Sequence, residues 1–212
     1  LSFLTFLTLA QNPTLNQLNA DGFKTGNWKK KHSSGKIKFE GTFENDTPVG
    51  EFNRYDINGK LTSKLIYSNS GQRAVAQIFK PNGVKLAAGV YINEKKDSLW
   101  KFFDKKGYLF SEQNYAAGIL DGESKEYYPN GNIHFQRNYK SGEIQGVYKE
   151  FYPNGQLRSK KIYQNGNPTG LVIVYYNNGV PKIVGKYNNG LKDGAWKFYD
   201  TRHKILKTET HE

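Results

Sequence analysis

The stretch EYYPNGNIHFQRNY at residues 126–139 is followed by EFYPNGQLRSKKIY at residues 150–163 and VYYNNGVPKIVGKY at residues 174–187. The three stretches repeat one phrase at a fixed spacing of 24 residues. In each, aromatic residues precede an Asn-Gly pair, and an alternating run that ends in Tyr follows it. Self-similarity at a period of this length indicates a repeat protein, in which each unit packs against the next.

The same period extends through nearly the whole chain without an insertion. In seven of eight units, Gly occurs nine residues after the first residue of the unit. In seven of eight, an aromatic residue occurs seventeen residues after it. We therefore expect a lead-in over residues 11–25 and a repeat array over residues 26–212. The eight units begin at residues 26, 50, 74, 98, 122, 146, 170 and 194, with Gly in all of these positions except Ala74 and Ser98.

Each unit has the pattern of a β-hairpin. Pro129-Asn130-Gly131 suits a turn, because Pro presets φ, Asn tolerates the next position and Gly accepts a left-handed conformation. The run from Ile133 to Tyr139 alternates with period two, which is typical of a strand with one packed face. A second turn follows, such as Gln164-Asn165-Gly166, and we expect it to be looser than the first. The sequence predicts an all-β fold, an elongated antiparallel meander of about eight 24-residue β-hairpin repeats.

Charge and composition limit the function without deciding it. The net charge is +12 over 212 residues, and there are no cysteines, so disulfides, thiolate zinc sites and cysteine nucleophiles are excluded. The basic surplus fits either an anionic partner or solubility and edge protection of a β-rich surface. Specific readers of phosphate and bases rely on Arg, of which the chain has only five, so solubility is favoured over an anionic partner.

The first ten residues, LSFLTFLTLA, are apolar and uncharged. They resemble the end of a secretory signal peptide, with Thr8 and Ala10 placed for a cut before Gln11. The alternative is an ordinary buried strand. The signal peptide, in a chain without cysteine, predicts export to the periplasm or the exterior, and we therefore expect no nucleic-acid partner.

The unit pattern resembles the bacterial variant of the MORN repeat. The best matches are Gly146-Val147-Tyr148, Tyr152-Pro153-Asn154-Gly155-Gln156-Leu157 and Tyr163-Gln164-Asn165-Gly166. Trp28, Trp100 and Trp196 occupy the third position of their units, as the pattern expects. The resemblance covers residues 26–212 and implies a module for protein or lipid contact; some members of the family are labelled antitoxins. The third and fourth units depart from the pattern at Ala74, Ala76 and Ser98, so a bend or an altered face is expected there.

Residues for catalysis are scarce. The four His residues occupy different phases of the repeat, and no pair has metal-ligand spacing. Asp97, Asp121 and Asp193 recur just before unit boundaries, where a turn role explains them better than acid–base chemistry. We expect no enzyme activity, no metal and no cofactor.

What remains is the surface. Aromatic doublets such as Tyr127-Tyr128 place consecutive rings on opposite faces of a strand, so one ring packs and the other is left for solvent, a partner or a second copy. The sequence therefore predicts a non-catalytic, exported repeat scaffold that contacts an unidentified protein, with a homodimer possible. The alternatives are binding of an anionic envelope lipid or glycan through a basic aromatic face, and antitoxin-like neutralisation. The candidate binding residues are Trp100, Phe102, Tyr128, Tyr152, Tyr176 and Trp196.

Overall fold

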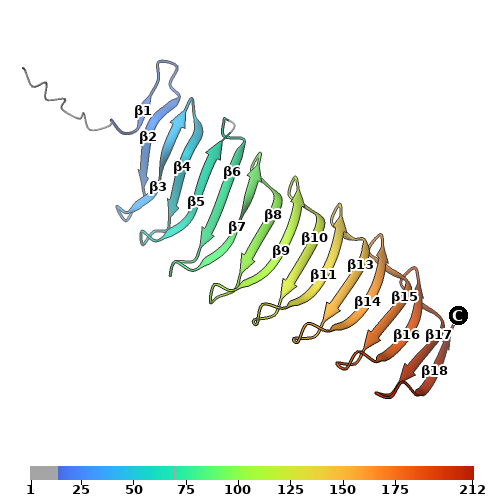
Figure 1. Cartoon of the computed structure of the whole chain (residues 1–212). Helices are drawn as coiled ribbons and strands as arrows, with labels where there is room; N and C mark the ends of the chain where they lie inside the picture. The colour runs from blue at the N-terminus through green and yellow to red at the C-terminus, as the bar shows by residue number, and fades with distance from the viewer. Residues whose placement is uncertain (1–13, 69) are drawn as a thin grey trace, which may run out of the picture.

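The computed structural model describes residues 14–68 and 70–212, so the predicted signal segment lies outside the described residues. Eighteen strands form one antiparallel sheet in which each strand pairs with its neighbours in sequence. Figure 1 shows this meander as a single elongated row of hairpins that runs from the N-terminal to the C-terminal end. The fold-class prediction is confirmed. The strands are β1 (Gln17–Leu18), β2 (Lys24–Lys31), β3 (Ile37–Glu44), β4 (Thr47–Tyr55), β5 (Leu61–Ser68), β6 (Arg73–Phe79), β7 (Lys85–Ile92), β8 (Lys95–Phe103), β9 (Leu109–Ala116), β10 (Ile119–Tyr127), β11 (Ile133–Lys140), β12 (Glu143–Ile144), β13 (Gly146–Phe151), β14 (Leu157–Gln164), β15 (Asn167–Tyr175), β16 (Pro181–Asn188), β17 (Leu191–Tyr199) and β18 (Ile205–His211).

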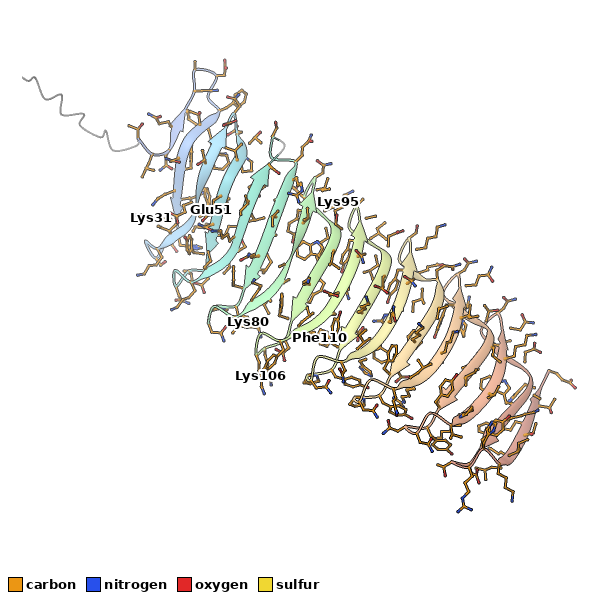
Figure 2. All side chains as sticks on the ribbon, viewed as in Figure 1. Lys31, Glu51, Lys80, Lys95, Lys106 and Phe110 are labelled. Carbon is orange, nitrogen blue, oxygen red and sulfur yellow. The ribbon has the colours of Figure 1, made fainter. Side chains whose placement is uncertain are left out.

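The first turn of each unit joins its two strands through five residues. In the second unit the backbone amide of Lys60 donates to the Asp56 carboxylate, and the backbone amide of Asp56 donates to the Lys60 carbonyl at 2.9 Å. Gly59 closes the turn with a φ of +83°, the left-handed conformation that the sequence pattern predicts. These turns form one long edge of the sheet, marked in Figure 2 by Lys80 and Lys106. We call it the first-turn edge.

The second turn, between units, is tighter than the first, so the expectation of a looser second turn is wrong. Asn165 and Gly166 connect β14 to β15 with φ angles of 49° and 76°. Two consecutive positive φ angles define the two-residue type I′ turn, whose twist matches that of the flanking strands. These turns form the opposite edge, where Lys95 lies in Figure 2. We call it the second-turn edge.

Most units contain a bulge where the sequence pattern places glycine. Gly41 pairs with Phe52 and Thr42 with Val49, so Gly50 and Glu51 bulge out of β4, and Gly50 has a φ of +63°. A bulge of this kind bends a strand. In the third unit Ala74 replaces the glycine, and the pairing of β5 with β6 runs without interruption.

The sheet is a single layer. In residues 14–68 and 70–212 no helix and no second sheet covers either face, and Figure 2 shows side chains on both sides of the ribbon. One face carries the third-position side chains, including Phe52, Trp100, Val172 and Trp196, which are 1–5% exposed. We call this the aromatic face and the other the opposite face. A core therefore exists only as a row of side chains along one side of one sheet.

Candidate functional site: the two faces of the array

Trp100 and Trp196 belong to the buried row of the aromatic face. Trp100 is 1% exposed and Trp196 is 5% exposed. Their indole Nε1 atoms donate to the carbonyls of Val90 at 2.9 Å and Lys186 at 3.1 Å. A ring this enclosed has no free surface to offer a partner. The prediction that these two residues are contact residues is therefore corrected: they hold one unit to the preceding one.

Large rings fit into this row because the preceding unit supplies a glycine beneath them. A Cβ added to Gly41 would lie 2.2 Å from the Phe52 ring, and one added to Gly89 would lie 2.3 Å from the Trp100 ring. Gly185 has the same relation to Trp196 at 2.3 Å. In two units where a larger residue replaces the glycine, the cross-strand partner is small: Leu65 lies opposite Ala76 and Gln113 opposite Ser124.

A lysine covers each tryptophan of the row from the second-turn edge. The Nζ of Lys96 lies 5.0 Å from the centre of the Trp100 ring, and Lys192 lies 4.6 Å from that of Trp196. Lys24 has the same place over Trp28 at 5.7 Å. Such cation–π contacts contribute roughly 0.5–1 kcal/mol at exposed sites and more when desolvated. Burial lowers the pKa of Lys96. The sequence signal, a lysine four residues before each tryptophan, was missed.

The third unit leaves a hollow on the aromatic face. Its third-position residue is Ala76, where the second and fourth units have Phe52 and Trp100. The hollow has a volume of about 380 Å³. Apolar side chains line its middle, and charged residues stand toward its two ends, Arg54 toward the first-turn edge and Glu94 at the second-turn edge. The lining residues are Pro48, Arg54, Ser63, Leu65, Tyr67, Gly71, Gln72, Ala74, Ile78, Tyr91 and Glu94.

Tyr128, Tyr152 and Tyr176 are half-buried along the first-turn edge. Each hydroxyl donates at 2.8 Å to a carbonyl of the following unit, those of Phe151, Tyr175 and Tyr199 respectively. These hydrogen bonds brace successive turns against each other. The three rings follow one another along the first-turn edge, and their hydroxyls are occupied within the chain.

Phe102 lies on the aromatic face beside the Trp row. Its ring stacks on that of Trp100 at a centroid distance of 6.2 Å, and the Nζ of Lys96 lies 4.8 Å from its centre. The side chain is half-buried. The structure thus separates Phe102 from the three tyrosines, because Phe102 comes two positions earlier in its unit and lies farther from the first-turn edge.

The acidic residues before unit boundaries have the predicted turn role in two of three cases. The Asp97 carboxylate accepts from the amide of Ala117 at 3.1 Å, and that of Asp121 accepts from the amide of Ser141 at 3.1 Å. Each bond joins one unit to the next second turn. Asp193 instead forms an ion pair with Lys186 at 3.0 Å.

Two carboxylates on the opposite face are held ionised by tyrosines. The Tyr127 hydroxyl donates to Glu112 at 2.6 Å, and this bond lowers the pKa of Glu112. The Tyr55 hydroxyl does the same for Glu40 at 2.6 Å. Burial, with the Glu40 hydrogen bond as the second cause, raises the pKa of Tyr55 to about 12. The pairs are structural, since each is closed within the sheet and neither borders the hollow.

The histidines do not converge. His32 bonds the Tyr55 carbonyl at 3.0 Å, His134 lies between Tyr128 and Phe135, and His203 stacks on Tyr199 at 4.8 Å. Within the described part of the chain, no group of three or more His, Asp or Glu residues could hold a metal ion. The same residues contain no helix long and apolar enough to span a bilayer.

Comparison with known proteins identifies the repeat. A family model described as "MORN repeat variant" matches residues 24–45, 120–141, 144–165 and 168–189. Each match begins two residues before a unit expected from the period. These four units are MORN-variant repeats, as the unit pattern in the sequence predicts. No curated protein matches it.

Among solved structures, one described as "Crystal Structure of TarM" aligns with 55% of this chain and 20% of its own, at 16% identity and a TM-score of 0.27. The chain therefore spans about a fifth of the length of that protein. A likeness at this score carries no argument about fold or function.

Proposed function

We propose that the protein is a non-catalytic scaffold that binds a partner polypeptide on its aromatic face, with the hollow over the third unit as the anchoring site. MORN repeats are commonly protein- or lipid-binding modules. The observation that carries the proposal is the hollow itself: about 380 Å³ in a face that nothing else covers within the described residues. A hollow of this size accepts one bulky apolar side chain.

The charges around the hollow fit a peptide. Arg54 is exposed, and its guanidinium lies 5.5 Å from the Phe52 ring, where it is available to a carboxylate. Glu94, in the second turn, is exposed at the opposite end. The floor between them is formed by Leu65, Ala74 and Ile78. In a peptide with an apolar residue next to an acidic one, the apolar side chain packs on the floor and the carboxylate pairs with Arg54.

The proposal places binding on the aromatic face of the third unit rather than on the row of Tyr128, Tyr152 and Tyr176. The hydroxyls of that row are used between units. Export of the protein to the periplasm or exterior stays a proposal that follows from the composition of residues 1–10.

Selection from a displayed library of random peptides tests the function. The expected result is enrichment of peptides with a large apolar residue beside an acidic residue, whose binding Arg54→Ala weakens about tenfold or more. Arg158→Ala is the matched control, because Arg158 is bonded to Glu150 at 2.6 Å and is remote from the hollow. Enriched peptides that bind Arg54→Ala as well as the unaltered chain contradict the proposal, as does a library without enrichment.

A further inference from the structure

The opposite face carries lysines along its whole length, and five of them, from the first to the seventh unit, have acidic partners. Lys29 pairs with Glu40 at 3.0 Å, and Lys64 with Glu51 at 2.7 Å. In the fourth and fifth units, Lys101 pairs with Glu112 at 3.1 Å, and Lys125 with Glu123 at 2.6 Å; Lys186 pairs with Asp193 at 3.0 Å. These five lysines therefore have their counter-charges within the sheet.

The sixth unit differs from this pattern. Lys149 of β13 lies directly opposite Lys160 of β14 in the strand register. Directly opposed like charges destabilise a sheet. Among the ion pairs of the described residues, none involves Lys149, Lys160 or Lys197. The pKa of Glu123 is lowered mainly by its hydrogen bond from Lys125, and the charge of Lys149 is a lesser cause. The Glu123 carboxylate is therefore already paired with Lys125.

These lysines belong to one continuous surface. The register runs from Lys160 to Ile173, from Ile173 to Val184 and from Val184 to Lys197, so their side chains follow one another across β14 to β17 on the same face. Lys149 extends the row to β13. Three lysines are thus arranged around two β-branched side chains.

A second row of apolar side chains lies next to the lysines, toward the second-turn edge. Val147 is directly opposite Ile162, and the two are 37% and 39% exposed. Leu171, on the next strand, is 54% exposed. We call Val147, Lys149, Lys160, Ile162, Leu171, Ile173, Val184 and Lys197 the lysine patch.

We propose that the lysine patch is a second docking surface, which takes an acidic amphipathic segment of a partner polypeptide. Carboxylates of the segment would supply the counter-charge that Lys149, Lys160 and Lys197 lack, and its apolar side chains would cover Val147, Ile162 and Leu171. Lys149 and Lys160 repel each other in the unbound sheet, and carboxylates of the bound segment would reduce this repulsion. Charge complementarity therefore favours an acidic segment.

The side-chain chemistry of the patch favours a polypeptide over other anions. Surfaces that enter a lipid bilayer use long or aromatic side chains, whereas four of the five apolar side chains here are the β-branched residues Val and Ile. Single-stranded nucleic acid needs aromatic platforms, and its phosphates favour Arg; the patch has neither. The patch is also on the face opposite the hollow, so it does not depend on the proposed peptide site.

The experiment uses the full chain and a fluorescent synthetic helical peptide with Leu along one side and Glu along the other. The same peptide with Gln in place of Glu is the charge control. The double variant Lys149→Gln/Lys160→Gln is compared with Lys101→Gln/Lys125→Gln, which removes two lysines from the same face that have their own acidic partners. Vesicles of phosphatidylcholine with phosphatidylglycerol form a parallel arm.

The expected result is binding of the Glu peptide, with Lys149→Gln/Lys160→Gln weakening it about tenfold or more and the control pair weakening it less than about threefold. The thermal midpoint of Lys149→Gln/Lys160→Gln should equal or exceed that of the unaltered chain, because the change removes a like-charge pair. Lys160→Glu provides a second variant: it creates an attractive pair with Lys149, raises the midpoint and removes binding.

Three outcomes overturn the proposal: no binding of the Glu peptide, equal binding of the Glu and Gln peptides, or equal losses in the two double variants. Vesicle binding that depends on Lys149 and Lys160 without peptide binding assigns the patch to a membrane surface instead. Because Leu beside Glu also suits the hollow, every protein in this experiment additionally carries Arg54→Ala, so that the two sites are tested separately.

Discussion

Replacement of Gly89 by alanine tests how one unit packs on the next. The added Cβ would lie 2.3 Å from Cδ2 of Trp100, closer than real Cβ contacts occur. The ring has no room to withdraw, because it is 1% exposed and its Nε1 is bonded to the Val90 carbonyl at 2.9 Å. Gly89 has no positive φ, so the cost comes from packing and not from backbone strain.

The magnitude follows from two opposing effects. Overpacking of a filled core costs about 1–3 kcal/mol. Replacing Gly by Ala restricts the unfolded chain and returns about 0.4–1 kcal/mol. We therefore expect Gly89→Ala to lower the free energy of unfolding by about 1–2 kcal/mol.

A double-mutant cycle separates the contact from other effects. Trp100→Ala alone should cost about 3–5 kcal/mol, as for other buried Trp residues. In that background Gly89→Ala should be neutral or slightly stabilising, because the ring it would strike is gone. Urea denaturation followed by β-sheet circular dichroism measures all four proteins. An equal cost of Gly89→Ala with and without the Trp100 ring, or no cost in either, refutes the packing argument.

Three further results are expected. Tyr152→Phe should lower stability by about 1 kcal/mol, through the lost hydrogen bond to the Tyr175 carbonyl, measured by thermal melting; no change would show that the bond contributes nothing. Asp121→Ala should increase hydrogen exchange of the Ser141 amide, which donates a hydrogen bond to the Asp121 carboxylate, and unchanged exchange would contradict the turn role. The pKa of Glu112 is lowered from 4.5 by Tyr127, so its contribution to stability is present above pH 4.5 and is lost as pH falls through the lower folded pKa. Tyr127→Phe should reduce that acid dependence in melting curves, and an unchanged pH profile would count against it.

The repeat and the hairpins could be predicted because they are written in local sequence. The Asn-Gly pairs and the 24-residue period determine where turns fall, and alternation determines which side chains share a face. The turn role of Asp97 and Asp121 was also predictable, since short acidic side chains commonly accept from nearby turn amides.

The roles of the aromatic residues could not be predicted from the phase of the repeat alone. Trp100 and Trp196 were assigned to contact surfaces, yet they are buried because Gly89 and Gly185 lie beneath them. That signal was present as a glycine eleven residues before each ring, outside the turns. The hydrogen bond from the Tyr152 hydroxyl to the Tyr175 carbonyl depends on the distance between successive first turns, and the sequence of one unit does not determine that distance.

The hollow illustrates the same limit. Ala76 is recognisable in the sequence as a departure from the pattern, and an altered face was expected at the third unit. The result of that departure depends on its neighbours: Leu65 opposite Ala76 fills part of the space, while Tyr67 and Tyr91 flank what remains. The sequence locates the irregular unit, but only the register across three units shows an open site.

The most direct test of the account is to map where a selected peptide touches the chain. A peptide enriched from the displayed library, with a photo-reactive group at its apolar residue, is cross-linked to the full chain and the attachment sites are identified by mass spectrometry. The account predicts attachment around the hollow, at Tyr67, Ile78 or Tyr91. Attachment along Tyr128, Tyr152 and Tyr176 instead would contradict it and would return the binding site to the first-turn edge.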